Sequence, residues 1–380
     1  MASSTTTTAH LGTTEKVSVL RVITYAGAII AFLIGSGFAT GQEILQYYAS
    51  YGFWGIFGTG SIVLVLISYV SVEFFLTGRR EQFEKPSGVF YYYCGKYLGV
   101  FFDYFSILFV FLSFTVMIAG AGAVFQEYYG LSKFVGGTLL AVAVAATVWF
   151  GLTSLVDVIG KIGPVIVVVA IALGIYGIVR NPDGIAAGNA LLEQVDVMQA
   201  SSNWFFSGLS YVGFCMLWLA AFLAALGKTV KNRREATAGG LVGGIAFSLA
   251  CAIVGLGLLA NMGDVFDAEI PMLVLASNLG PWVGALISVM ILAGIFTTAI
   301  PLLWTVTARF FDEKTKQSKY LTIALAALGT VIGLVLPFSQ MVNTVYVING
   351  YVGIVLLVLM IVRTVRHLAT RSRRSTPAEA

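Results

Sequence analysis

Long stretches without charged side chains restrict the fold of this chain more than any other feature of its sequence. From Val22 to Val72 there is a single charged residue, Glu43, and several later stretches of similar character contain none. A helix that crosses a bilayer needs about 20 consecutive, mainly apolar residues. With 58% hydrophobic and 11% charged residues and a mean hydropathy of +0.91, the sequence predicts an all-α polytopic membrane protein.

The charge-free stretches divide into ten predicted membrane spans, five in each half of the chain. A polar connection from Asn181 to Asp196 separates the halves. Because each half has an odd number of spans, the halves cross the membrane in opposite directions, as an inverted repeat requires. The predicted spans lie in Val22–Val72 (two spans), Tyr104–Gln126, Phe134–Val156, Ile162–Val179, Val197–Gly227, Ala236–Gly263, Ile270–Ala308 and Tyr320–Val362 (two spans).

The basic residues predict the orientation, because cytoplasmic loops of membrane proteins collect Lys and Arg. With the N-terminus inside, only Lys133 and Arg180 of the 22 basic residues fall outside. We therefore expect both termini in the cytoplasm, and a net charge of +4 that reflects topology instead of nucleic-acid binding. The predicted order is a disordered cytoplasmic tail (1–18), a first five-helix repeat (19–180), an external connection (181–202), a second five-helix repeat (203–363) and a basic cytoplasmic tail (364–380).

The sequence lacks the residue sets that are typical of enzyme active sites. Both histidines, His10 and His367, lie in the predicted tails, and the cysteines Cys94, Cys215 and Cys251 have no paired spacing. A Ser/His/Asp triad, a zinc motif or a phosphate-binding loop cannot be assembled from such residues. We therefore expect neither an enzyme nor a resident cofactor. The expected partners are the lipid bilayer and a small-molecule substrate, without nucleic acid.

Two predicted spans carry glycines near their middle and are predicted to be broken helices. The stretch from Arg21 to Ser50 is longer than a straight span needs, and Gly35-Ser36-Gly37 interrupts it. Glycines also let membrane helices pack closely, which is the alternative explanation. Equivalent interruptions in the two halves favour the central site of a transporter. In the sixth span, the corresponding residues are Ser207, Gly208, Ser210, Tyr211 and Gly213.

The sequence "IGSGFATGQEILQYYASYGFWG", which begins at Ile34, resembles the signature of the YkvI-type bacterial membrane proteins. These proteins belong to the amino acid-polyamine-organocation superfamily with the LeuT-type fold. The sixth-span sequence "LSYVGFCMLWLAAFLAALG" and the ten-span length match as well, so the resemblance covers nearly the whole chain outside the tails. It implies a LeuT-type fold with helices 1 and 6 broken, and a transporter in the bacterial cytoplasmic membrane.

The resemblance also implies two sites. In LeuT-type transporters the broken first and sixth helices hold the substrate, and a sodium site joins first-helix carbonyls to the eighth helix, which "AGIFTTAIP" (Ala293–Pro301) resembles. Some members of the wider group use protons or exchange substrates without sodium, and paired threonines often bond back to their own helix. The implied substrate-binding residues are Gly35, Ser36, Gly37, Phe38, Ser210, Tyr211, Gly213 and Phe214. The implied sodium ligands are carbonyls of Ala31, Ile34 and Gly294 and hydroxyls of Thr297 and Thr298.

Glu43 is a further candidate for the substrate site. Ser36, Thr40, Glu43 and Tyr47 follow a helical spacing that places them on one face if this segment is helical. A carboxylate at membrane depth is costly and by default functional. We therefore expect Glu43 to meet a substrate amine, to carry a coupled proton or to form an outer gate. The alternative is a structural carboxylate near the external interface, with its head in water or bonded to a neighbouring glutamine.

Together these features predict a secondary active transporter that moves a small organic solute, an amino acid or an amine, by alternating access. Sodium and protons are both candidates for the coupling ion. The alternative is a ligand-sensing receptor or a channel-like protein on the same fold, which would bind a solute without accumulating it. The oligomeric state is left open, and one chain is expected to be sufficient.

Overall fold

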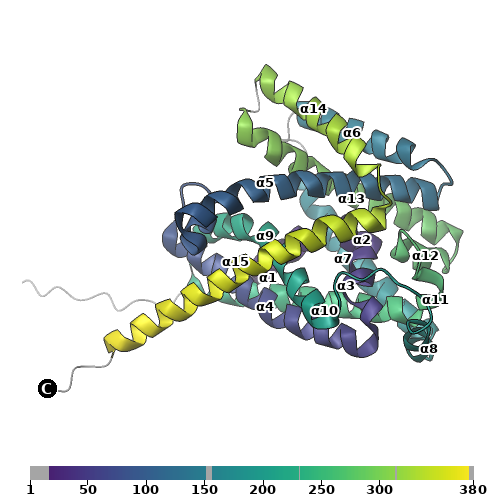
Figure 1. The fold of residues 1–380 in the computed structure, drawn as a ribbon, viewed down its shortest axis with the longest axis horizontal. Helices are drawn as coiled ribbons and strands as arrows, with labels where there is room; N and C mark the ends of the chain where they lie inside the picture. Colours follow the sequence, from purple (N-terminus) through teal and green to yellow (C-terminus); the bar gives the residue numbers. More distant parts are fainter. Residues whose placement is uncertain (1–16, 151–155, 231, 313–314, 376–380) are drawn as a thin grey trace, which may run out of the picture.

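The computed structural model describes residues 17–150, 156–230, 232–312 and 315–375, and this part of the chain forms helices without a β-strand (Figure 1). Nearly all of the predicted N-terminal tail therefore lies outside the described residues. The elements in chain order are α1 (Val19–Leu33), α2 (Ser36–Thr40), α3 (Gln42–Tyr47), η1 (Ala49–Tyr51), α4 (Gly52–Glu81), α5 (Gly88–Glu127), α6 (Lys133–Phe150), α7 (Val156–Arg180), α8 (Gly184–Leu191), α9 (Trp204–Thr229), α10 (Arg233–Ala260), α11 (Met262–Val265), α12 (Pro271–Ser277), α13 (Pro281–Phe310), α14 (Lys316–Gly333) and α15 (Phe338–Ser375).

Several of these helices are long and apolar enough to cross a bilayer. The described residues contain seven such helices, or eight if the bent pair Pro164–Arg180 and Gly184–Leu191, which meet at 94°, counts as one span. Helix α1 has only 15 residues, and α14 is not among the seven. The all-helical, multi-span architecture predicted from the sequence is therefore present.

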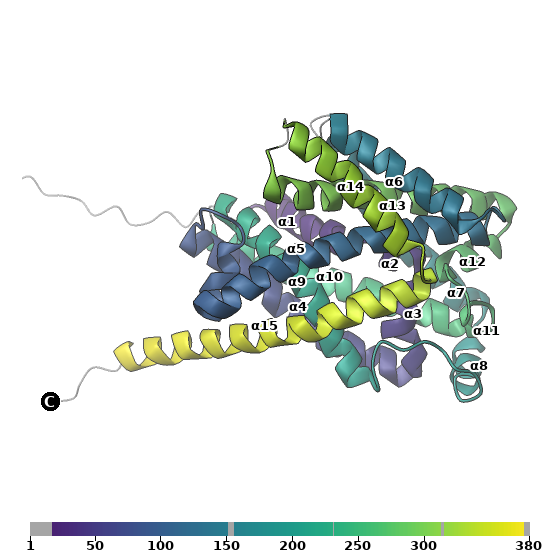
Figure 2. The ribbon, with the colours of Figure 1, turned by 45° about the horizontal axis from the view of Figure 1, so that its top comes forward.

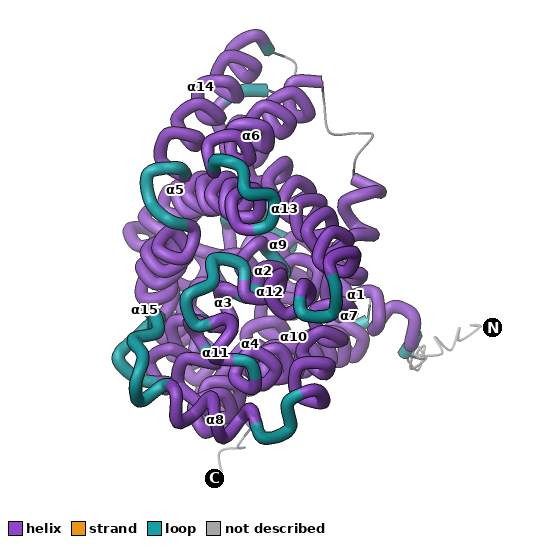
Figure 3. The backbone as a smooth tube through the Cα atoms, turned by 90° about the vertical axis from the view of Figure 1, so that its right-hand side faces the viewer, coloured by secondary structure: helices purple, strands orange, loops and turns teal. Residues whose placement is uncertain are grey.

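The helices pack in two groups around one continuous apolar core. In the first group, α4 packs along α9 and α10, α9 packs along α15, and α1 packs along α10. In the second group, α5 packs against α6, α13 and α14 and also reaches α15. Figures 1 and 3 show α6 and α14 side by side at one edge of the molecule. Helix α1 contacts α9 and α10 of the first group, whereas α2, which follows it in the chain, contacts α5 and α13 of the second.

The first predicted span is interrupted at two places. Ile34 and Gly35 are extended between α1 and α2, next to the predicted interruption. The second interruption is Gly41, whose φ of 84° is left-handed and ends α2 before α3 begins. A residue with a Cβ rarely adopts that conformation, which explains a glycine at this position. The second interruption rules out one helical face through Ser36, Thr40 and Glu43.

Helix α9 runs from Trp204 to Thr229 without interruption, so the predicted break in the sixth helix is wrong. Its glycines allow close packing instead. A Cβ added to Gly213 would lie 2.0 Å from the Gly350 carbonyl oxygen of α15, and one added to Gly208 would lie 3.1 Å from Ile62 of α4. Small residues at helix crossings let membrane helices approach closely. The alternative explanation of the glycines therefore holds for α9.

Two helices extend beyond the spans predicted for them. Helix α5 begins at Gly88, before the third predicted span, so it includes residues 88–103, which are rich in aromatic side chains. It bends at Gly95, where φ is 71°. Helix α15 continues to Ser375, and Figures 1 and 2 show its C-terminal part projecting away from the other helices. The segment predicted as a C-terminal tail from residue 364 therefore begins inside a helix.

Candidate functional site

The interruption between α1 and α2 leaves main-chain carbonyl groups without helical partners. Because α1 ends at Leu33, the N–H group that would pair with the Ala31 carbonyl belongs to Gly35, which lies outside the helix. Among the described residues, no backbone hydrogen bond outside the helical ladders ends on the carbonyl of Ala31 or Ile34. Such carbonyls at membrane depth are suited to bind a ligand or an ion.

Glu43 of α3 is completely buried. Its Oε1 accepts a hydrogen bond of 2.6 Å from Tyr211 Oη of α9, whereas Oε2 has no hydrogen-bond partner. A Cβ added to Gly37 would lie 2.6 Å from Oε2, so this oxygen packs directly against the α2 backbone. No ion pair in the described part of the chain involves Glu43. The alternative of a carboxylate in external water or bonded to a neighbouring glutamine therefore does not hold in this structure.

Aromatic rings from three helices enclose the carboxyl group. The Tyr211 ring meets the rings of Tyr47 and Tyr48 edge-on, each at a centroid distance of 5.2 Å. Phe214 meets Tyr211 edge-on at 5.0 Å and stacks on Tyr346 of α15 at 5.0 Å. Edge-on and stacked pairs are the arrangements that aromatic rings prefer. The carboxyl group therefore lies in a well-packed aromatic environment.

Buried polar atoms without partners concentrate around Glu43. Besides Glu43 Oε2, the hydroxyls of Tyr47, Ser210, Ser36 and Tyr346 are buried and make no hydrogen bond of good geometry. Tyr47 Oη lies near Ser210, and Tyr346 Oη lies near Ser36. Most buried polar groups in proteins have well-formed hydrogen bonds, so a concentration of poorly satisfied polar atoms makes this region a candidate polar site. The Glu43 cluster denotes Ser36, Glu43, Tyr47, Ser210, Tyr211 and Tyr346.

A cavity of about 930 Å³ leads from one end of the bundle toward the helix interruption. The exposed residues Lys85 and Pro86 of the α4–α5 connection, and Arg309 near the end of α13, line its mouth. Gly35, which is buried, and Trp218 line its inner part. By the positive-inside pattern, the mouth lies on the predicted cytoplasmic side.

Trp218 of α9 lies between this cavity and the Glu43 cluster. Its side chain lines the cavity and stacks on Phe109 of α5 at 5.5 Å. On its other side the indole ring meets Phe214 and Tyr346 edge-on, each at 5.5 Å. The indole ring of Trp218 therefore contacts both a residue that lines the cavity, Phe109, and a residue of the cluster, Tyr346.

All five residues of the predicted sodium site line the same cavity. Ala31 and Ile34 line it from the first helix, and Gly294, Thr297 and Thr298 line it from α13. Thr297 Oγ1 donates a 3.0 Å hydrogen bond to the Gly294 carbonyl, which is the backward bond expected of a threonine in a helix. The hydroxyl oxygen keeps lone pairs for a cation, and carbonyl and hydroxyl oxygens suit a hard cation. The oxygen types of these five residues are therefore those that suit a hard cation such as sodium.

The opposite side of the first helix is covered. The Gln46 side-chain amide of α3 donates to the Ser339 carbonyl at the start of α15 (2.9 Å). The Ser339 N–H in turn donates to Glu269 Oε2 (2.7 Å) in the connection before α12. Pro271 and Met272 of α12 lie over Gly41, where a Cβ would be 2.6 Å from the Met272 side chain. Access to the Glu43 cluster from this side is therefore closed.

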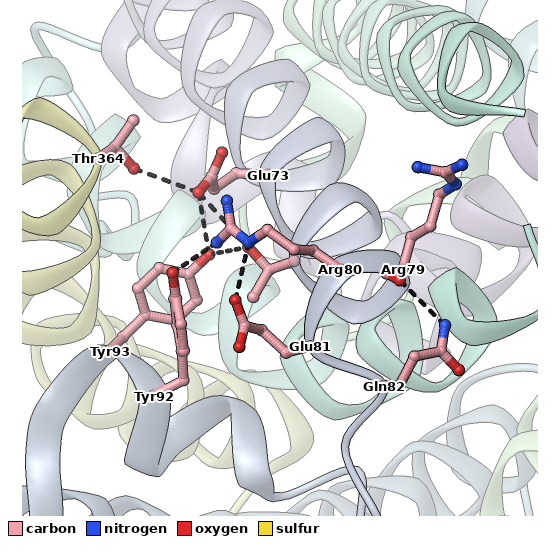
Figure 4. A network of polar contacts seen from close by, with 9 residues as sticks. Glu73, Arg79, Arg80, Glu81, Gln82, Tyr92, Tyr93 and Thr364 are labelled. Carbon is pink, nitrogen blue, oxygen red and sulfur yellow. Dashed lines mark hydrogen bonds and ion pairs between the residues drawn. The ribbon is translucent and has the colours of Figure 1, made fainter. Parts of the chain in front are cut away.

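Polar contacts join the helices at the end where the cavity opens. Arg309 Nη2 and Asp103 Oδ2 form an ion pair of 2.9 Å between α13 and α5 at the cavity mouth. Figure 4 shows a second set of contacts, in which Glu73 Oε1 of α4 accepts hydrogen bonds from Tyr93 of α5 (3.2 Å) and Thr364 of α15 (3.4 Å). These contacts fix the relative positions of α4, α5, α13 and α15 at that end.

The structure brings some of the predicted substrate residues together and separates others. Ser36, Gly37, Glu43, Ser210, Tyr211 and Phe214 belong to or contact the Glu43 cluster. The Thr40 hydroxyl donates to the Gly37 carbonyl (3.1 Å) and accepts from the Gln42 N–H (3.4 Å), so its bonds stay within the turn. Gly35 lines the cavity, Gly213 packs against α15, and Phe38 pairs with the Phe247 ring at 6.1 Å.

Three residues of this region were not predicted from the sequence: Tyr48, Trp218 and Tyr346. Tyr346 is completely buried in α15, although α15 is remote from α2 in the sequence. A signal was present, since Tyr346 lies about two helical turns inside an apolar span, away from the interfacial belt where aromatic residues usually gather. That signal says that Tyr346 faces protein, but not which helix it faces.

Comparisons with known proteins show what this chain resembles. No family model matches it. It is 24% identical over 329 residues, 86% of this chain and 91% of the relative, to the uncharacterized membrane protein YkvI of Bacillus subtilis. The fold is similar to that of MhsT in complex with L-phenylalanine, with a TM-score of 0.60, 20% identity and coverage of 92% of this chain and 90% of that chain. It is also similar to Mhp1, a nucleobase-cation-symport-1 family transporter with bromovinylhydantoin bound, with a TM-score of 0.50, 14% identity and coverage of 85% and 74%. These likenesses confirm the resemblance to YkvI-type membrane proteins and the LeuT-type fold.

Proposed function

We propose that this chain, which resembles YkvI-type membrane proteins and has the LeuT-type fold, is a secondary active transporter of a small organic solute, an amino acid or an amine. Its ten spans form a five-plus-five inverted repeat in the cytoplasmic membrane of a bacterium, with both termini inside. The positive-inside distribution of its basic residues supports this orientation.

The proposal rests on one observation: the interruption of the first helix is accessible from only one end of the helix bundle. A cavity of about 930 Å³ reaches Gly35 from one end, while Gln46, Ser339 and α12 cover the first helix from the other end. A channel would connect both ends at once, whereas an alternating-access transporter opens one end at a time. The arrangement corresponds to the inward-facing state of such a cycle.

The transport cycle requires a second state, in which the outer side is open and the inner side is closed. The Gln46–Ser339 and Ser339–Glu269 hydrogen bonds open on the outer side, and the cavity between α1, α5 and α13 closes on the inner side. Solute and ion drive this exchange only if they bind the two states with different free energies. We propose sodium as the coupling ion, held by the carbonyls of Ala31, Ile34 and Gly294 and the hydroxyls of Thr297 and Thr298.

Transport by the purified chain in proteoliposomes tests the proposal. We expect a solute that binds the protein to accumulate inside vesicles when a sodium gradient is imposed, and to exchange with preloaded solute without a gradient. A proton gradient applied alone serves as the control for the coupling ion. Saturable binding without accumulation or exchange would contradict transport and favour a ligand-sensing receptor on the same fold.

A further inference from the structure

The Glu43 cluster contains a carboxyl group and several hydrogen-bond acceptors, but no basic side chain contacts it among the described residues. Glu43 Oε2 is unpartnered in a site with no exposed surface. The titratable groups around it are the phenols of Tyr47, Tyr48, Tyr211 and Tyr346 and the thiols of Cys215 and Cys251. None of these is a positively charged side chain. A group that pairs with Glu43 Oε2 must therefore supply N–H or O–H donors, and only a cation that enters the site can balance the charge of an ionised carboxylate there.

The surrounding rings favour an organic cation over a bare metal ion. The rings of Tyr47, Tyr211, Phe214 and Tyr346 surround the carboxyl group, and the centroids of neighbouring rings lie 5.0 to 5.6 Å from each other. Aromatic faces attract an ammonium group through the ring quadrupole, most strongly where water is excluded. The hydroxyls of Ser36 and Ser210 supply additional acceptors for its N–H groups.

The cluster offers no counter-charge for a carboxylate on the same solute. No Lys, Arg or His contacts the described residues of the cluster through a hydrogen bond or an ion pair. Helix α2, which begins at Ser36, has only five residues, so its N-terminus gives little dipole field. An amino acid would therefore place its carboxylate next to Glu43 or against aromatic rings, and both positions are unfavourable.

Space for the rest of the solute lies toward the cavity. A Cβ added to Gly35 would meet only Met117 Cε and Trp218 Cη2, both at 3.7 Å. These two side chains are apolar at their contact atoms, and the cavity begins at Gly35 and Trp218. An apolar tail that extends from the ammonium group toward Trp218 fits this surface.

We propose that Glu43 is the counter-ion for the protonated primary amine of the solute, and that the solutes of this protein are small amines with an apolar tail and without a carboxylate. This inference rests on the proposed function, since it names the solute class of the same transporter.

Binding of three compounds that share one tail tests the inference. The probes are 2-phenylethylamine, phenylalanine and 3-phenylpropionate, added to the purified full chain and followed by calorimetry. We expect 2-phenylethylamine to bind roughly 10- to 100-fold more tightly than either carboxylate. Butylamine, which keeps the amine and shortens the tail, should bind more weakly than 2-phenylethylamine but with the same dependence on Glu43. Phenylalanine or 3-phenylpropionate binding as tightly as the amine, or no saturable binding of either amine, would overturn the inference.

Two variants assign the interaction to Glu43. Glu43→Gln keeps the shape of the side chain and removes its charge, so it should weaken 2-phenylethylamine binding roughly 10- to 100-fold. Tyr211→Phe removes the hydroxyl that donates to Glu43 Oε1 and leaves Oε2 in place. This variant should therefore still select amines. It provides a second test if Glu43→Gln does not fold. Glu193→Gln, at an exposed residue, is the matched control and should bind as the parent does. Unchanged amine binding in a folded Glu43→Gln protein, or loss of amine selectivity in a folded Tyr211→Phe protein, would overturn the assignment.

The failure of amine recognition can be distinguished from the failure of the proposed transport function. Amine binding that depends on Glu43, without transport in vesicles, contradicts the transporter and supports the recognition of amines. Transport of 3-phenylpropionate that is unaffected by Glu43→Gln supports the transporter and overturns the recognition of amines.

Discussion

Replacing both Thr297 and Thr298 with alanine should abolish the stimulation of transport by sodium. Thr297 and Thr298 of α13 line the same cavity as Ala31 and Ile34 at the end of the first helix. Without the two threonine hydroxyls a sodium ion would keep at most the main-chain carbonyls as protein ligands, too few for a hard cation that needs a nearly complete oxygen shell. We therefore expect the sodium concentration for half-maximal uptake to rise roughly 100-fold or more, beyond the measurable range.

The measurement is uptake of labelled solute into proteoliposomes at a series of external sodium concentrations. Thr305→Ala is the matched control, since Thr305 also lines the cavity but is exposed and lies farther along α13. It should leave the sodium dependence unchanged. Uptake by the double variant with the sodium dependence of the parent would contradict this site, and full stimulation by a proton gradient alone would show that protons drive the cycle.

Replacing Gly37 with alanine should weaken solute binding roughly tenfold or more while the protein still folds. The added methyl group would lie 2.6 Å from Glu43 Oε2, 3.0 Å from Glu43 Cβ and 3.1 Å from the Tyr346 ring. It would therefore force the carboxyl group out of its position and occupy space beside the unpartnered oxygen. Close contacts of this kind cost about 1–3 kcal/mol when the surroundings must shift, so we expect solute affinity to fall roughly tenfold or more.

Gly27→Ala provides the matched control for this change. Gly27 lies in α1, and a Cβ there would meet no atom within 4 Å, so the same substitution should leave binding unchanged. Both variants should retain the elution volume and melting temperature of the parent within a few degrees. Parent-like solute affinity in Gly37→Ala would show that the space beside Glu43 Oε2 is not used by the solute.

The first helix was more accessible to sequence reasoning than the sixth. Gly35 and Gly37 lie in a stretch too long for one straight span and next to the isolated charge of Glu43, and these features together favour an interruption. Gly208 and Gly213 resemble them in composition, but their function is to allow contact with Ile62 and with the backbone at Gly350. In the sequence, a glycine that interrupts a helix cannot be distinguished from a glycine that allows close helix packing. The difference becomes clear only when the residue that faces the glycine is known.

The same reason limits how much of the Glu43 cluster the sequence predicts. Its charged residue and its partner Tyr211 could be selected, because both stand out within apolar spans. The place of Tyr346 depends on how α15 crosses α9, which Gly213, Gly350 and Gly353 determine through backbone contacts. The cavity is also unpredictable from the sequence, since it is formed by parts of α1, α5, α9 and α13 that are distant along the chain.

Thiol labelling from each side of the membrane tests most directly the claim that the protein works by alternating access. A cysteine at Ala221, which lines the cavity, reports the inner side, and a cysteine at Met272, which is 1% exposed over Gly41, reports the outer side. Each is labelled in proteoliposomes by a membrane-impermeant thiol reagent applied to one side, and the label is counted above that of the parent chain. We predict that conditions that increase labelling of Met272→Cys from outside decrease labelling of Ala221→Cys from inside. Labelling of both positions that rises together, or stays constant while solute is transported, would contradict alternating access.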